Sequence, residues 1–102
     1  MTSKHDQLID IIAEELKRRG YENIYKNIEY KRNKTIIGEI DLYATHKHYV
    51  LLFEMKTTYG HKSYYKAKNQ LNRAEKKYFK SYQRVFKFYV CNLYDPFIKW
   101  IK

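Results

Sequence analysis

A buried strand that ends in charged residues is the feature of this sequence that most constrains its fold. Residues 50–53 read Val-Leu-Leu-Phe without a polar interruption, as expected of a strand covered on both faces. Because side chains alternate between the two faces of a strand, Glu54 and Lys56 fall on the same face as Leu52. Charges at the end of a buried strand need partners or a ligand, so this end is a candidate site.

A pair of acidic residues lies one short turn upstream of this strand. Glu39 and Asp41 alternate on one face of a strand predicted over residues 35–44, with Ile36, Ile40 and Leu42 expected on the other. If this strand pairs with the strand predicted over residues 49–57, Asp41 and Glu54 converge near the strand ends.

Two carboxylates without a neighbouring Cys/His cluster suit a hard divalent cation, Mg²⁺ or Mn²⁺. Lys56 then lies beside the metal, where it can orient an attacking water and neutralise charge that develops on phosphoryl oxygens. An acid and a lysine at alternate positions are also a means of protecting sheet edges. The apolar strand, the upstream acid and the cationic segment that follows favour the site.

The remaining patterns predict a mixed α/β (α+β) architecture in a single domain over residues 1–102. Apart from the two strands above, we expect a helix over residues 4–19, a strand over 24–31, a helix over 64–82 and a strand over 85–91. The fourth strand follows a helical crossover and should run parallel to the third. Residues 97–102 fit either a short helix behind Asp95 and Pro96 or an edge strand.

Positive charge gathers in the second half of the chain. The net charge is +10, yet residues 1–55 hold nine basic and nine acidic residues, whereas residues 56–87 hold ten basic residues and one acid, Glu75. This distribution indicates a surface for a polyanion, with a solvated lysine-rich surface as the alternative. The candidate phosphate contacts are Lys62, Lys66, Arg73, Lys77 and Lys80.

The single Cys91 and the absence of a secretory signal predict an intracellular protein, in the cytoplasm or in that of a host if the protein is viral. No apolar run is long enough to span a bilayer, and no membrane partner is expected. Cys91, His46 and His48 are interpreted as ordinary core and loop residues, whereas His61 and the tyrosines 59, 64 and 65 are secondary candidates for substrate contact.

Asp41 followed by Glu54-Met55-Lys56, after a helix and a hairpin and before a helix that carries Gln70, resembles the PD-(D/E)xK nuclease superfamily. The Gly-Glu-Ile-Asp wording of residues 38–41 and the small size are most similar to its archaeal-type Holliday junction resolvases. The resemblance implies a restriction-endonuclease-like fold and a metal-dependent DNA endonuclease. It makes Asp41 and Glu54 metal ligands, the Met55 carbonyl a further ligand, Lys56 the catalytic lysine and Gln70 a supporting residue.

The sequence departs from the resolvase pattern in two places. Ile40 stands before the first acid where the motif has proline, and this departure is common in the superfamily. Resolvases also place a further glutamate on the sheet-facing side of the first helix. That side centres on Ile12, with His5 near its centre and Glu15 near its edge, which makes Glu15 the candidate ligand from this helix.

Three functions follow from these observations. The leading hypothesis is a DNA nuclease, and the second is a non-catalytic nucleic-acid-binding protein that retains the nuclease fold. The third is an adaptor whose positive charge serves an acidic protein partner. A resolvase acts on two symmetry-related strands, so that hypothesis predicts a homodimer, with the apolar residues 97–101 as its candidate interface.

Overall fold

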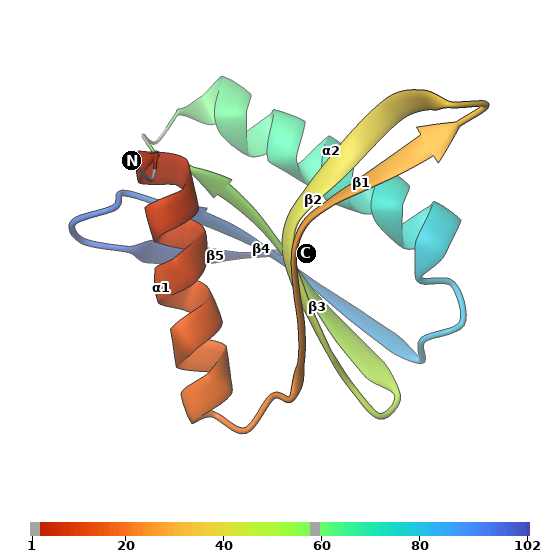
Figure 1. Cartoon of the computed structure of the whole chain (residues 1–102). Coiled ribbons are helices and arrows are strands. Elements are labelled where there is room, and N and C mark those ends of the chain that lie inside the picture. The colour runs from red at the N-terminus through yellow and green to blue at the C-terminus, as the bar shows by residue number, and fades with distance from the viewer. Residues whose placement is uncertain (1–2, 58–59) are drawn as a thin grey trace.

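A mixed five-stranded sheet separates two helices in the computed structural model, which describes residues 3–57 and 60–102 (Figure 1). The strand order follows the chain, β1-β2-β3-β4-β5, and only β3 and β4 are parallel. The elements are α1 (Lys4–Arg18), β1 (Asn23–Arg32), β2 (Thr35–His46), β3 (Tyr49–Lys56), α2 (His61–Tyr78), β4 (Arg84–Cys91) and β5 (Phe97–Ile101). This confirms the predicted mixed architecture of a helix, an antiparallel meander, a crossover helix and a further strand. The C-terminal residues adopt the edge strand of the two alternatives.

Local hydrogen bonds close helix α1 at both ends. The Ser3 hydroxyl accepts a hydrogen bond from the backbone N–H of Asp6 at 3.0 Å. At the other end Gly20 adopts a φ of 94°, and the backbone N–H of Tyr21 donates to the Leu16 carbonyl at 3.1 Å. The buried face of α1 packs on one side of the sheet against Leu42, Phe53 and Met55 of β2 and β3.

Helix α2 covers the opposite side of the sheet through Ala67, Leu71 and Ala74. Its predicted bounds, residues 64–82, are wrong by three or four residues at each end. The helix begins directly after Gly60, whose extended backbone serves as the N-cap. It ends before Phe79, which leaves the helical conformation at a φ of −125° and buries its ring in the core. Burial of Phe79 therefore stops the helix one turn before Tyr82.

Strand β3 lies at the centre of the sheet and is buried on both faces, as predicted. Val50 and Leu52 face α2, whereas Phe53 and Met55 face α1. Glu54 and Lys56 continue the alternation of Leu52 and therefore lie on the α2 side. The strand thus carries its two charged residues to the edge of the core beneath α2.

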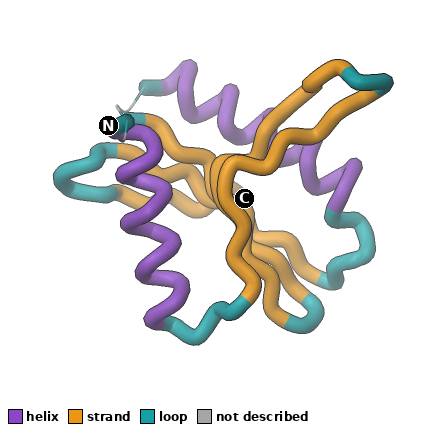
Figure 2. The backbone as a smooth tube through the Cα atoms, in the orientation of Figure 1, coloured by secondary structure: helices purple, strands orange, loops and turns teal. Residues whose placement is uncertain are grey.

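Strand β2 bends where it reaches Asp41, and this departs from the prediction. Ile40 and Leu42 were expected on one face, but Ile40 packs in the cluster beneath α2 and Leu42 in the cluster beneath α1. The regular pairing of β2 with β3 ends at the pair of Leu42 and Phe53. On the other side of β2, Asn27 of β1 lies opposite the position of Asp41 and has a φ of 53°. This local interruption of both strands twists the hairpin, and the distal half of β1 and β2 leaves the sheet and crosses α2 (Figures 1 and 2).

The predicted turn between β2 and β3 is shorter than expected, because β2 continues to His46 rather than Ala44. Lys47 at this turn takes a φ of 48°. No helix among the described residues is both long enough and apolar enough to cross a membrane.

Candidate active site

Asp41 lies at the point where β2 separates from β3. Its carboxyl is buried, and Oδ2 accepts a hydrogen bond from the backbone N–H of Met55 at 2.9 Å. The same oxygen lies 3.2 Å from Nε2 of His5, at the start of α1. Just beyond the last regular backbone pair, a hydrogen bond to the side chain of Asp41 therefore replaces the backbone hydrogen bonds between β2 and β3.

Glu54 is the second buried carboxyl of the site, with only 3% of its surface exposed. Its Oε2 atom has no hydrogen-bond partner within residues 3–57 and 60–102. The Lys56 ammonium lies 4.0 Å from its other oxygen and is one-third exposed. Burial, together with the neighbouring Asp41 carboxyl, raises the pKa of Glu54 to about 10, although Lys56 acts in the opposite direction. The sheet thus holds two acids side by side, and ionisation of both costs free energy unless a cation lies between them.

These residues line a hollow of about 640 Å³ between α1, the β1–β2 hairpin and α2. Its acidic wall comprises Asp6, Glu39, Asp41 and Glu54, and its basic residues are Lys56 and Arg73. Burial and the charge of Asp41 raise the pKa of Glu39 as well. Four acids and two cations around one hollow suit a metal ion and a phosphate held next to each other.

Gln70 connects α2 to the strand that carries Asp41. Its side-chain amide donates a hydrogen bond to the backbone carbonyl of Glu39, two residues before Asp41. Arg73, one turn further along α2, lines the hollow itself. The structure therefore brings Asp41, Glu54, Lys56 and Gln70 to one place.

Glu15 is not brought to this place. It lies toward the far end of α1, where its two oxygens bind Arg18 at 2.8 Å and Arg19 at 3.0 Å. These two guanidinium groups lower the pKa of Glu15. The expectation that Glu15 is a metal ligand is thus wrong for this structure, because the residues of α1 that reach the hollow are His5 and Asp6 of its first turn.

The donor set fits a hard divalent cation held by few protein ligands. No group of three or more His, Cys, Asp or Glu side chains suited to a metal ion occurs among the described residues. Two carboxylates are nevertheless present at the hollow, and one buried oxygen of Glu54 has no partner in the described chain. Mg²⁺ is commonly bound through one or two carboxylates while water and substrate complete its coordination.

The five predicted phosphate contacts, Lys62, Lys66, Arg73, Lys77 and Lys80, are all exposed. The first four lie on α2, and Lys80 follows the end of the helix. At 100° per residue, the four helical residues fall on one side of α2, next to Gln70 and away from the buried stripe. A cationic surface therefore runs along α2 from the hollow.

The secondary candidates either pack against neighbouring side chains or lie exposed on the surface, apart from one that falls outside the described residues. His46 stacks on Tyr49 with ring centres 5.2 Å apart, and Cys91 is buried. Tyr64 packs edge-on against Tyr89 at 5.7 Å. Tyr65 is 60% exposed on α2, His61 begins that helix, His48 is an exposed turn residue, and Tyr59 lies outside the described residues.

Two features of the site were missed in the sequence. The first is the contact of His5 with Asp41, for which the position of His5 near the centre of the sheet-facing side of α1 was the available signal. The second is the contact of Gly38 with Tyr30. A Cβ atom on Gly38 would lie 2.0 Å from Cζ of Tyr30, so a larger residue fits here only if the Tyr30 ring moves away. The wording of residues 38–41 contains this glycine, but its partner is eight residues upstream.

The family model described as "NERD: Nuclease-related domain" matches residues 6–96. This family falls in the PD-(D/E)xK-like nuclease group. The matched segment includes both buried carboxyls, Lys56 and Gln70. No curated protein matches the chain.

Proposed function

We propose that this chain, which belongs to the nuclease-related domain family, is a metal-dependent DNA endonuclease that hydrolyses phosphodiester bonds. The family implies a nuclease-like function and a nucleic-acid substrate. The observation that carries the proposal is the convergence of Asp41, Glu54 and Lys56 on one hollow next to a cationic helix. We further propose that residues 1–102 act as one domain, since both helices pack on the same sheet.

Asp41 and Glu54 are the residues that would hold Mg²⁺ or Mn²⁺, with the Met55 carbonyl as a further ligand. When bound, such an ion lowers the pKa of water and polarises the phosphoryl group. Glu54 must lose its proton to serve as a ligand, because its raised pKa keeps it neutral at pH 7. Asp41 is held in place by the Met55 N–H and by His5.

Lys56 is proposed to act at the scissile phosphate. Its one-third exposure leaves the ammonium accessible from the hollow, and Nζ lies 4.0 Å from Oε1 of Glu54. A cation at this position stabilises negative charge as it develops on the phosphoryl oxygens and orients the attacking water. Arg73 on the opposite wall is suited to a neighbouring phosphate.

Gln70 is proposed as a positioning residue. Its hydrogen bond to the Glu39 carbonyl ties α2 to the segment of β2 that no longer pairs with β3. Without this tie, Asp41 would be placed by its own two contacts alone. The same tie sets the distance between the carboxyls and the cations of α2.

The test is a cleavage assay on four-way junction, duplex and single-stranded DNA, each with Mg²⁺, with Mn²⁺ and with EDTA. Asp41→Asn and Lys56→Met should abolish metal-dependent cutting and leave DNA binding largely intact. The matched controls are Asp10→Asn and Lys17→Met, which alter exposed residues of α1 outside the hollow. Cutting by the two site variants at the parental rate would refute the assignment. The preferred substrate would decide whether the chain acts like a Holliday junction resolvase.

The second candidate is a nucleic-acid-binding protein that retains the nuclease fold without activity. It is favoured by α1, whose contact with Asp41 comes from His5 and not from the glutamate that the resolvase resemblance leads us to expect on this helix. DNA retention without cleavage under any metal condition would support this candidate. A failure to bind DNA or RNA at low salt would instead favour the adaptor for an acidic protein.

The oligomeric state is a separate proposal. Resolvase-like action requires a homodimer, and the edge strand β5 is the candidate interface because Phe97, Ile98 and Trp100 are each about half exposed. Light scattering coupled to size-exclusion chromatography at micromolar concentration measures this directly. We also propose an intracellular setting, as expected for a DNA-cleaving protein with one buried thiol.

A further inference from the structure

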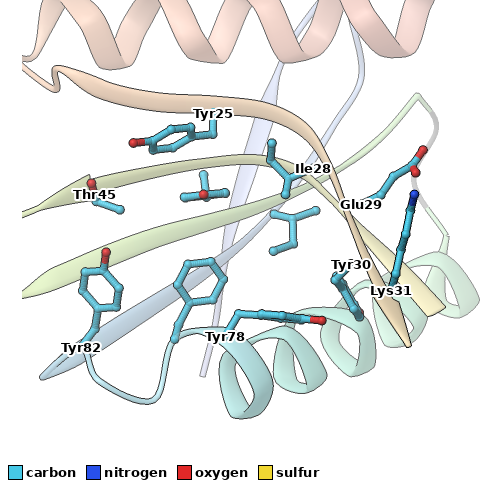
Figure 3. Close-up of a pocket in the computed structure, with 11 residues that line it drawn as sticks. Tyr25, Ile28, Glu29, Tyr30, Lys31, Thr45, Tyr78 and Tyr82 are labelled. Atoms are coloured by element: carbon cyan, nitrogen blue, oxygen red, sulfur yellow. The ribbon is translucent and has the colours of Figure 1, made fainter. Parts of the chain in front are cut away.

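A second cavity lies between the β1–β2 hairpin and the C-terminal end of α2, and the nuclease site does not use it (Figure 3). Its volume of about 590 Å³ is within the range of small-molecule sites in proteins. Its polar lining residues are Glu29, Lys31 and Thr45. Aromatic side chains dominate the rest of its wall: Tyr25, Tyr30, Tyr43, Tyr78, Phe79 and Tyr82.

The rings of this aromatic cavity hold one another in place. Tyr43 stacks on Tyr25 with ring centres 4.7 Å apart and meets Phe79 edge-on at 5.2 Å. Tyr30 lies 5.2 Å from Tyr78. Tyr25 and Tyr78 are nevertheless 42% and 47% exposed, and they approach the cavity from the hairpin and from α2 respectively (Figure 3). Rigid rings with free faces are suited to a flat, unsaturated ligand.

The aromatic cavity adjoins the catalytic hollow through Tyr30. The Tyr30 ring lines the cavity and packs directly on Gly38, which lines the hollow. The two spaces are also connected along α2, since Arg73 lines the hollow and Tyr78 lines the cavity five residues later. Five residues of helix correspond to about 7.5 Å.

Positive charge follows the same path. Lys31 is part of the cavity wall, and Lys77 and Lys80 are sequence neighbours of the cavity-lining Tyr78 and Phe79, with Lys77 turned about 100° from Tyr78 around the helix. A phosphate backbone that contacts Arg73 at the hollow and continues along these cations would carry its next bases past the cavity. Cations and aromatic rings thus occur together toward the C-terminal end of α2, a combination found in proteins that bind single strands.

We propose that the aromatic cavity binds an unstacked nucleobase of the nucleic acid whose backbone lies on α2. The substrate would then contain unpaired or flipped-out nucleotides next to the cleaved phosphate. This inference rests on the proposed function in so far as the ligand is a nucleic acid. A base fits because it combines a flat face for the tyrosines, a polar edge for Thr45, and a phosphate for the lysines of α2 and for Lys31 at the border of the cavity.

The test measures binding in EDTA, so that cleavage does not interfere. Fluorescence anisotropy compares a short labelled oligodeoxythymidylate with an abasic oligomer of equal length and equal charge. The parent protein should bind the base-containing oligomer about 5- to 100-fold more tightly, the range expected for stacking of one base. This comparison needs no variant and therefore does not depend on the folding of one.

Tyr25→Ala and Tyr78→Ala should each remove most of this difference by weakening the base-containing oligomer alone. The matched control is Tyr94→Ala, which removes an exposed tyrosine ring, 87% exposed, from the segment between β4 and β5 outside the cavity. Circular dichroism verifies that each variant is folded. The control should keep the parental preference for the base-containing oligomer.

Equal affinity of the parent for the two oligomers would overturn the inference, as expected if the cavity accepts a protein side chain instead. A preference that survives both tyrosine substitutions would overturn it as well. Base-dependent binding without any metal-dependent cleavage would refute the nuclease but support the cavity as a base site. Cleavage with base-independent binding would remove the cavity proposal and leave the nuclease.

Discussion

Glu54 should destabilise the metal-free fold, and its replacement by glutamine should reveal by how much. The pKa of Glu54 is raised from 4.5 in the unfolded chain to about 10 in the folded protein, mainly by burial. At pH 7 the folded protein therefore holds a proton on Glu54 that the unfolded chain has released. Because the pKa in the folded protein exceeds 7, the loss of folding free energy at pH 7 is set by the difference between pH 7 and the unfolded pKa of 4.5. At about 1.4 kcal/mol per pH unit this difference amounts to about 3 kcal/mol.

The sign follows from the proton count. The folded state binds more protons than the unfolded state at every pH between the two pKa values, so the stability contribution of Glu54 falls as the pH rises above 4.5. Glutamine is neutral at all pH values and has nearly the shape of protonated glutamate. Glu54→Gln should therefore be more stable than the parent by up to about 3 kcal/mol at pH 7, and by less than about 1 kcal/mol at pH 5.

Urea unfolding in EDTA, followed by circular dichroism at pH 5 and pH 7, measures both differences. Glu15→Gln is the matched control, because Arg19 and Arg18 lower the pKa of that exposed glutamate. Its substitution should change stability slightly and in the opposite direction. If Glu54→Gln is no more stable than the parent at pH 7, or if its advantage does not shrink at pH 5, the reasoning about this buried acid fails.

Three further predictions concern the same region. Gly38→Ala should lower the free energy of unfolding by about 1–3 kcal/mol through its clash with Tyr30, and Tyr30→Leu should reduce this loss in the double variant. Mn²⁺ affinity should rise between pH 6 and pH 8 because Glu54 releases its proton when the ion binds. Calorimetry in two buffers of different ionisation enthalpy measures this release, and an equal binding enthalpy in both buffers would contradict it. Arg73→Ala and Lys77→Ala should each reduce the slope of log affinity for duplex DNA against log salt by about 0.9, and an unchanged slope in an equilibrium titration would exclude a phosphate contact.

The sequence predicted most of what depends on local periodicity. The two-sided burial of β3 follows from the residue pattern within that strand, and the parallel direction of β4 follows from the helix that connects it to β3. The meeting of Asp41 with the end of β3 also followed, because a short turn between two strands determines which residues face each other. These are the features for which neighbouring residues carry the information.

The sequence did not predict the features that depend on interruptions of regular strand pairing or on the packing of separate elements. Nothing in the alternation around Asn27 indicates that a non-glycine residue would adopt a φ of 53° and twist the hairpin. The misplacement of Glu15 has a similar origin, since helical periodicity specifies a side of α1 but not which turn lies over the end of β3. The aromatic cavity was missed because its rings come from three separate segments.

The bend of β2 at Asp41 connects the two sites. Because β2 leaves β3 there, the Met55 N–H is available to the Asp41 carboxyl and Glu54 faces a hollow rather than a neighbouring strand. The same bend turns Ile40 toward α2 and places the hairpin over the C-terminal part of that helix, which encloses the aromatic cavity. A change that straightened the hairpin would therefore disturb the paired carboxyls and the aromatic cavity together. The conformation of Asn27 and the tie between Gln70 and the Glu39 carbonyl are thus properties of both sites, although neither residue carries the proposed chemistry.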